Sequence, residues 1–187
     1  MLNNIIEEYK QKILTKENTE LRNFFLMKID EIAGQNYVWY FIYGSNLSQT
    51  QLENRLRDLE DKILQEKPGL LKNFRFAYNK NSKDGTAKAN IVEDEGQTVE
   101  GLAVLLKKET LDKFHKKFEK GYDLIAITIT VKDDNIQNNN EREIEGWTYI
   151  SKSITNEKPD INYVKTILTG AVQKGLSTEY IDRFLKM

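Results

Sequence analysis

Apolar and polar residues alternate over short segments in the middle of the chain, and this pattern predicts β-strands. Between residues 122 and 131, one face would carry Leu124, Ala126 and Thr128, and the other would carry Ile125, Ile127 and Ile129. Further strands are predicted at 37–43, 70–78, 87–92, 99–106 and 143–151. Residues 94–97 are expected to form a hairpin-type turn, and the asparagine-rich segment 133–141 an exposed one.

Other segments carry apolar residues every three or four positions, which is typical of amphipathic helices. Helices are predicted at 48–59 and 111–118, and two more follow Pro159 and are separated at Gly175. Strands outnumber helices in the middle of the chain, and most connections there are short. We therefore expect an α+β fold: a mixed, mainly antiparallel small β-barrel or curved sheet with surrounding helices.

The first 36 residues are predicted to form an N-terminal helical extension, and residues 37–187 the main domain. The extension reads as two short amphipathic helices ending near Gly34. Its apolar stripe would pack against the body of the same chain or form a homodimer contact. We expect no catalytic role for it.

Composition narrows the possible functions. The 187 residues include 28 basic and 29 acidic side chains, which indicates no nucleic acid or anionic membrane as partner. The longest uncharged apolar stretch, 37–43, is too short to span a bilayer, and Glu7 and Glu8 stand where a secretory signal would be positive. We expect a cytoplasmic protein. With no cysteine and one histidine, His115, we expect no cysteine or histidine-rich metal site, so chemistry would rest on carboxylates, hydroxyls, backbone amides and that one imidazole.

The segment after the first predicted strand is the best candidate for a ligand site. The strand stops at Gly44, and a helical pattern begins at Ser48, so several backbone amides between them lack a regular partner. Such amides lie at the positive end of the helix dipole and bind carboxylate or phosphate oxygens. Gly44 would permit a close approach that a side chain would block. The alternative is an ordinary strand–turn–helix unit without a ligand.

Residues 40–47, with the sequence YFIYGSNL, closely resemble the signature YFxYGSNL of the gamma-glutamylcyclotransferase-like family. The resemblance extends from about residue 37 to the end of the chain, with further similar segments at 89–91, 99–102, 122–129, 147–150, 159–163 and 170–180. Ser177 stands where the family has proline. The first 36 residues have no counterpart in this resemblance.

The resemblance implies an activity and a set of site residues. Enzymes similar to this one cyclise a gamma-glutamyl group and release 5-oxoproline with a free amine or amino acid, without metal or cofactor. It also implies that the glutamyl group is held by Tyr43, Gly44, Ser45, Asn46 and Leu47, and that Tyr149 closes the other side of the pocket. One glutamate would act as base and then as acid, with a pKa raised by burial.

Glu119 is the candidate for that glutamate. Counted without a gap, the family's glutamate position falls on Phe118, and Glu119 comes one residue later. A one-residue slip on a helix turns a side chain by about 100°, but a shifted helix end would bring Glu119 back to the pocket. The alternative for Glu119 is a solvated surface carboxylate. Asp112 and Glu93 are possible substitutes, and His115 is expected on the helix surface.

Two functional hypotheses follow. In the first, the protein is an enzyme acting on a small gamma-glutamyl amide or dipeptide. In the second, it is a catalytically inactive family member that binds a small carboxylate or amine metabolite, or acts as an interaction module. The position of Glu119 separates them: an enzyme needs this carboxylate beside residues 44–46, whereas Phe118 in that place would favour binding alone.

Overall fold

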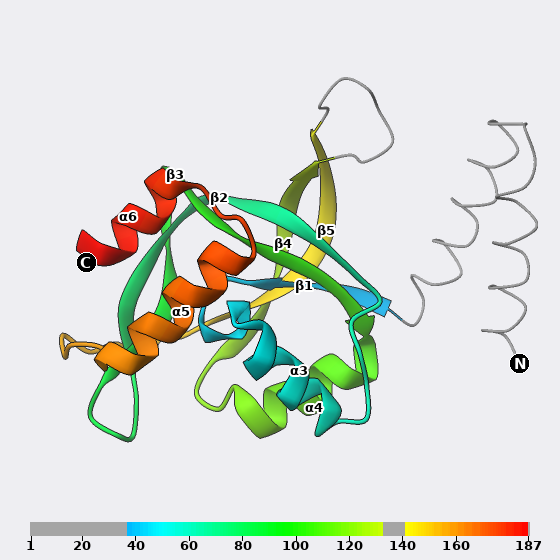
Figure 1. Cartoon of the computed structure of the whole chain (residues 1–187), viewed down its shortest axis with the longest axis horizontal. Helices are drawn as coiled ribbons and strands as arrows, with labels where there is room; N and C mark the ends of the chain where they lie inside the picture. Colours follow the sequence, from blue (N-terminus) through cyan, green and yellow to red (C-terminus); the bar gives the residue numbers. More distant parts are fainter. Residues whose placement is uncertain (1–36, 133–140, 187) are drawn as a thin grey trace, which may run out of the picture. The chain divides into compact units, whose positions relative to one another are not determined.

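The computed structural model describes residues 37–132 and 141–186 (Figure 1). The strands in this part are β1 (Tyr37–Ile42), β2 (Gln65–Asn81), β3 (Ala87–Lys107), β4 (Asp123–Lys132) and β5 (Glu141–Ile150). The helices are η1 (Ser45–Leu47), α3 (Gln49–Arg57), α4 (Lys108–Phe118), α5 (Ile161–Gln173) and α6 (Thr178–Lys186). The predicted N-terminal extension, its dimer contact and most of the 133–141 turn lie outside the described residues.

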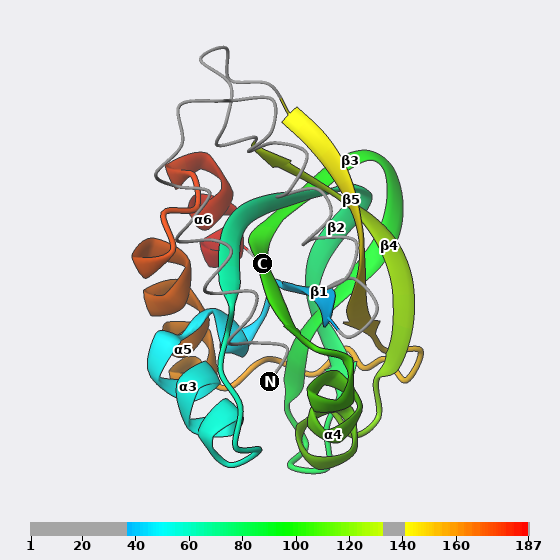
Figure 2. The same ribbon diagram turned by 90° about the vertical axis from the view of Figure 1, so that its right-hand side faces the viewer.

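The strands close into a barrel in the order β1, β3, β2, β4, β5. Strands β2 and β3 pair antiparallel along most of their length, and β4 and β5 pair in the same way. Strand β1 runs parallel to β5, with Trp39 opposite Gly146. Figure 2 shows the strong curvature of the sheet, with α5 and α6 along one flank and α3 and α4 near one end. The expectation of a mixed, mainly antiparallel curved sheet with surrounding helices is confirmed.

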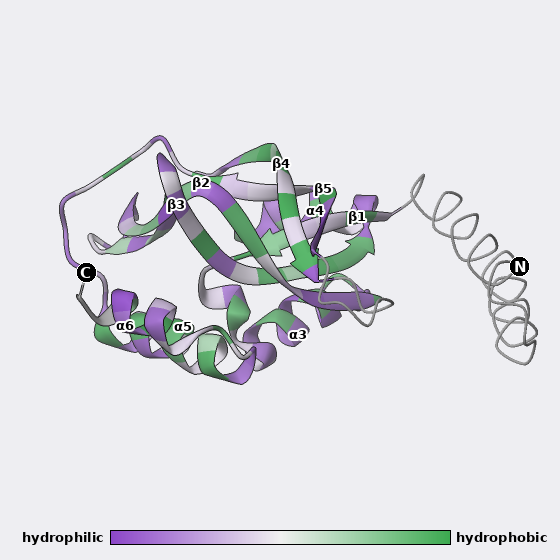
Figure 3. Ribbon diagram, turned by 90° about the horizontal axis from the view of Figure 1, so that it is seen from above, coloured by the Kyte–Doolittle hydropathy of each residue, from purple (hydrophilic) through white to green (hydrophobic). Residues whose placement is uncertain are grey.

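The core fills the space between the sheet and the helices. It includes fully buried side chains from both layers: Phe41 on β1, Leu106 on β3 and Ile167 on α5. Hydrophobic and hydrophilic positions alternate along the strands and helices, as Figure 3 shows. The pattern that predicted the elements therefore also decides which of their faces point inward.

The number of strands differs from the prediction. Segments 87–92 and 99–106 are two parts of β3, and residues 94–97 do not reverse the chain. The pairing with β2 jumps from Lys72 opposite Thr98 to Phe74 opposite Glu93, so residues 94–97 form a bulge. Asn73 has a φ of 63°, and its side-chain oxygen accepts a hydrogen bond from the Gly96 amide at 3.1 Å. The turn-forming residues here bend a long strand instead of ending it.

Helix α5 lies directly against η1, the turn that follows β1. A Cβ atom at Gly170 would lie 2.4 Å from the carbonyl carbon of Leu47 and 2.4 Å from the amide nitrogen of Ser48. Only glycine permits this approach, because no side-chain atom fits between helix and turn. The start of α5 is fixed by Asp160, whose carboxylate accepts hydrogen bonds from the amides of Asn162 and Tyr163.

None of the helices within the described ranges has the length and apolar character that crossing a bilayer requires.

Candidate active site

The turn after β1 has the geometry expected of a ligand-binding loop. Its 3₁₀ turn is closed by hydrogen bonds from the Leu47 amide to the Gly44 carbonyl, at 2.9 Å, and from the Ser48 amide to the Ser45 carbonyl, at 3.1 Å. Within the described part of the chain, the amides of Ser45 and Asn46 donate to no other backbone group. A Cβ at Gly44 would lie 3.2 Å from the Cβ of Ala89, so glycine allows β3 to approach the turn.

A small hollow opens beside this turn. Its volume is about 30 Å³, enough for one or two water molecules. The lining combines the turn, one carboxylate and five tyrosines: Tyr40, Tyr43, Gly44, Ser45, Asn46, Ala89, Glu119, Tyr122, Tyr149 and Tyr163. A ligand larger than water must therefore move some of these side chains when it enters.

Glu119 lies in this hollow, next to the turn. It is the first residue after α4 and has left the helical conformation, with φ −111° and ψ 39°. Its Oε1 accepts hydrogen bonds from Asn46 Nδ2 and from an Arg55 guanidinium nitrogen, both at 3.0 Å. The side chain is 12% exposed, which does not fit a solvated surface carboxylate. The catalytic role of Glu119 stays a prediction, but its position beside the turn is the one that the enzyme hypothesis requires.

Phe118 does not take that position. Its ring packs against Phe114, with 5.2 Å between the centroids, and lies under the Arg55 guanidinium at 5.1 Å. Aligning the family's glutamate position without a gap therefore selects Phe118, whereas the carboxylate in the hollow is that of Glu119. Because the helix ends at Phe118, the 100° step per residue no longer applies to Glu119, and the side chain turns back toward the barrel.

The electrostatics of Glu119 reflect its burial. Loss of solvation raises the pKa of this carboxyl above its usual value, while Arg55, the hydrogen bond from Asn46 and the charge of Lys80 act in the opposite direction. Burial in turn lowers the pKa of Lys80, whose ammonium lies 4.9 Å from the centroid of the Tyr122 ring. A carboxyl whose pKa is raised holds a proton more readily than an exposed one, which suits a group that must take up and return a proton.

The five tyrosines supply neutral hydroxyls. Burial raises the pKa of Tyr163 to about 12 and raises those of Tyr40, Tyr43, Tyr122 and Tyr149 as well. Most of their hydroxyls are held by the protein. The Tyr122 hydroxyl donates to the Ala89 carbonyl at 2.7 Å, and the Tyr163 hydroxyl accepts from the Ala89 amide at 3.1 Å. The hydroxyl of Tyr43 donates to the Tyr149 carbonyl, which joins two of the predicted site residues.

Some predicted residues lie elsewhere. Leu47 is fully buried in the core and does not line the hollow, so it supports the turn from behind and is not placed to touch a ligand there. Asp112 and Glu93 are exposed and are not part of the lining. His115, expected on the helix surface, is partly buried. Its ring stacks on Tyr149 at 5.3 Å, and its Nδ1 is buried without a partner in the described ranges.

The prediction missed Arg55. It lies four residues after Gln51 on α3, and both side chains reach Asn46 Oδ1, at 2.8 Å from Arg55 and 3.3 Å from Gln51. This spacing places the two residues on one face of the helix. This spacing was the only signal in the sequence, and it does not say which face of the helix returns over the motif.

Comparisons with known proteins agree with the fold. Residues 99–184 match the model of the AIG2-like family. A solved structure of a gamma-glutamyl cyclotransferase superposes with a TM-score of 0.67 at 22% sequence identity, covering 81% of this chain and 88% of that chain. The fold of the domain is gamma-glutamylcyclotransferase-like.

Two further structures share the gamma-glutamylcyclotransferase-like fold. An uncharacterized protein from Homo sapiens has a TM-score of 0.66 at 22% identity, with 81% of this chain and 88% of that chain covered. A gamma-glutamyl cyclotransferase specific to glutathione from yeast has a TM-score of 0.60 at 9% identity, with 81% and 95% covered. No protein with a curated description matches the sequence. The AIG2-like match includes Glu119 and Tyr149 and begins after residues 43–47.

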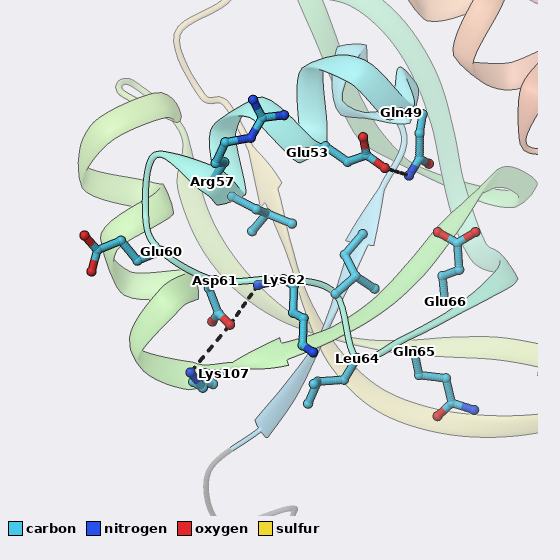
Figure 4. A pocket seen from close by; sticks show the side chains of 12 residues that line it. Gln49, Glu53, Arg57, Glu60, Asp61, Lys62, Leu64, Gln65, Glu66 and Lys107 are labelled. Carbon is cyan, nitrogen blue, oxygen red and sulfur yellow. Dashed lines mark hydrogen bonds and ion pairs between the residues drawn. The ribbon is translucent and has the colours of Figure 1, made fainter.

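The domain also has a larger groove, of about 870 Å³, on the other side of α3 (Figure 4). Gln49, Glu53 and Arg57 line it from the helix, and Asp61 pairs there with Lys107 at 3.5 Å. It contains none of the predicted site residues. In the ranges that the structure describes, no three histidine, aspartate or glutamate side chains gather in a way that could hold a metal ion.

Proposed function

We propose that this domain catalyses cyclotransferase-type cleavage of a gamma-glutamyl amide or dipeptide, releasing 5-oxoproline and a free amine or amino acid. The observation that carries the proposal is the position of Glu119, a buried carboxylate 3.0 Å from Asn46 and beside the backbone amides of the turn. An acid/base group and an oxyanion-binding turn are the two parts that this reaction needs.

The first step is an attack within the substrate. At neutral pH the α-amine of the glutamyl group is largely an ammonium, so a base must remove one proton before its nitrogen can attack the γ-carbonyl carbon. Glu119 would accept this proton. The new carbon–nitrogen bond closes a five-membered ring, and the carbonyl oxygen becomes negatively charged in the tetrahedral intermediate.

The second step breaks the original amide bond. The amides of Ser45 and Asn46 would donate hydrogen bonds to the charged oxygen of the intermediate, which lowers the barrier to its formation. As the intermediate collapses, Glu119 would return its proton to the departing nitrogen, and the ring nitrogen would release its remaining extra proton to water. The products are 5-oxoproline, a free amine or amino acid, and one proton, which the amine takes up at neutral pH. Tyr43, Gly44 and Tyr149 would surround the glutamyl group.

The test is release of 5-oxoproline from a panel of gamma-glutamyl amino acids and gamma-glutamyl amines, followed by chromatography. We expect Glu119→Gln to remove release from every compound that the wild type cleaves. The matched control is Glu109→Gln, because Glu109 is a glutamate at the exposed side of α4, with a 72% exposed side chain. Activity of Glu119→Gln at the level of the control would remove Glu119 from the mechanism.

A wild-type protein that releases no 5-oxoproline would contradict the proposal. If such a protein still shows NMR shift changes at residues 43–47 when a gamma-glutamyl compound is added, it is instead a binding member of the family.

A further inference from the structure

The two oxygens of the Glu119 carboxylate have different surroundings. Oε1 accepts two hydrogen bonds, one from Asn46 Nδ2 and one from Arg55, each at 3.0 Å. Within residues 37–132 and 141–186, Oε2 accepts none. A carboxylate oxygen that already accepts two hydrogen bonds, one of them from a cation, is a poor proton acceptor, so the other oxygen is left for proton transfer.

Arg55 is held firmly in the position that produces this difference. The same guanidinium nitrogen that contacts Glu119 also donates to Asn46 Oδ1 at 2.8 Å. The guanidinium carbon lies 5.1 Å from the centroid of the Phe118 ring and 5.9 Å from that of Phe114. Cation–π contacts of this kind stabilise an arginine whose charge is partly withdrawn from water. Arg55 is 25% exposed, so its ion pair is only partly screened by solvent.

The other groups around Glu119 do not offer a second cation in direct contact. Lys80 on β2 acts on it through its charge alone, with no hydrogen bond or ion pair to it in the described ranges. The remaining titratable neighbours are the hydroxyls of Tyr40 on β1, Tyr149 on β5, Tyr163 on α5, and of Tyr43 and Tyr122. These hydroxyls are neutral at physiological pH, so Arg55 is the cationic partner that touches the carboxylate.

We propose that Arg55 is a positioning residue for the reaction: together with Asn46 it fixes Oε1 of Glu119 and leaves Oε2 to take up and return the proton. The inference rests on the proposed function, because it assigns a role within the same proton transfer. Arg55 holds the carboxylate in one orientation and favours its ionised form, which is the form that starts the reaction. Without it, the buried carboxyl would keep its proton to a higher pH and could rotate.

The experiment compares three variants. Arg55→Met keeps a long side chain but removes its charge, and it is measured beside Arg55→Lys and Arg57→Met. Arg57 is an exposed arginine on the same helix and serves as the matched control. The readout is the pH profile of kcat/KM for the best gamma-glutamyl substrate. We expect the acidic limb of Arg55→Met to move to higher pH, and kcat/KM near neutral pH to fall by about 10- to 100-fold.

Arg55→Lys should move the acidic limb less, because it keeps the charge, and Arg57→Met should leave it in place. A merely structural role would change the amount of folded protein without moving the limb. An acidic limb of Arg55→Met that coincides with that of the wild type would overturn the inference. If Arg55→Met does not fold, Arg55→Lys carries the test, since a lysine cannot reproduce the planar contact with Glu119 Oε1, Asn46 Oδ1 and the two phenylalanine rings.

A second readout separates this inference from the proposed function. Titration of the Glu119 carboxyl carbon by NMR, assigned by comparison with Glu119→Gln, reports its pKa whether or not the protein is active. A wild type that releases no 5-oxoproline contradicts the proposed function. Equal Glu119 pKa values in wild type and in Arg55→Lys and Arg55→Met contradict the role of Arg55, and a higher pKa in the variants supports it.

Discussion

The side-chain amide of Asn46 donates a hydrogen bond to the carboxylate of Glu119, and the two residues are 73 positions apart in the sequence. The bond joins the turn after β1 to the residue that ends α4. The same amide group also lies 3.3 Å from the hydroxyl of Tyr40. Asn46 is 6% exposed, so it is a buried polar group whose hydrogen bonds are all made inside the protein.

Replacing Asn46 by aspartate should therefore disable the site. Asn46→Asp removes the donor to Oε1 and places a second carboxylate beside Glu119, which raises the pKa of Glu119 further by repulsion. We expect kcat/KM for release of 5-oxoproline to fall by about 100-fold or more. Asn54→Asp makes the same change at an exposed position of α3 and should have little effect. Equal losses in the two variants would show that added charge, and not the lost contact, is responsible.

The pH dependence of stability should reveal the buried carboxyl. Because burial raises the pKa of Glu119 above 4.5 in the folded state, the folded protein binds this proton more tightly than the unfolded chain does. Its contribution to stability is complete below pH 4.5 and is lost as the pH rises through the folded-state pKa. We expect the unfolding free energy of the wild type, relative to Glu119→Gln, to fall as the pH rises above 4.5 in urea titrations. A difference that grows with pH would mean that the Arg55 pair outweighs burial.

The contact between α5 and the turn should not tolerate a side chain. In Gly170→Ala the new methyl group would lie 2.4 Å from backbone atoms of Leu47 and Ser48, so helix or turn must shift. We expect a loss of about 1 to 3 kcal/mol in unfolding free energy, measured in urea, together with reduced activity. Val172→Ala is the control, since Val172 is 64% exposed on the same helix. Unchanged stability in Gly170→Ala would show that the turn can move away from the helix at no cost.

Two tyrosines of the barrel should respond differently to loss of the hydroxyl. Tyr122→Phe leaves the Ala89 carbonyl without its hydrogen bond and should lower the unfolding free energy by about 1 kcal/mol. The Tyr78 hydroxyl is buried with no partner in the described part of the chain, so Tyr78→Phe should be neutral or stabilising. Thermal or urea unfolding of both variants tests this contrast. A larger loss of unfolding free energy in Tyr78→Phe than in Tyr122→Phe would contradict this, because it would mean that the Tyr78 hydroxyl has a hydrogen-bond partner and the Tyr122 hydroxyl has none.

Local patterns were sufficient to predict most of the fold. Alternation along 122–131 and 143–151 reflects a strand with one face toward the core, so each strand could be recognised without its neighbours. The bulge at 94–97 was misread because turn-forming residues favour a bend in both a hairpin and a bulged strand. Whether the chain reverses there depends on the pairing of β3 with β2 on both sides of Asn73, and that pairing is not local.

The site was only partly predictable for the same reason. The turn itself is a local feature, and Gly44 pointed to it. Glu119 depended on a resemblance, since no local pattern says that the residue after α4 returns to a turn far earlier in the chain. Arg55 was missed because its sequence surroundings are those of an ordinary exposed helix position. Its partners become visible only when α3 and α4 are placed side by side.

The glycine contact of α5 also bears on how the protein is made. The YGSNL segment leaves the ribosome before the helix that supports it, Ile161–Gln173, which follows it by more than 100 residues. A nascent or prematurely terminated chain that lacks this helix has the motif, but α5 does not pack against it. It also lacks the Tyr163 hydroxyl that accepts a hydrogen bond from the Ala89 amide. Chains that end before this helix should therefore be unable to engage a gamma-glutamyl ligand, and the ability to do so should arise only after Ile161–Gln173 has been synthesised and has folded against the turn.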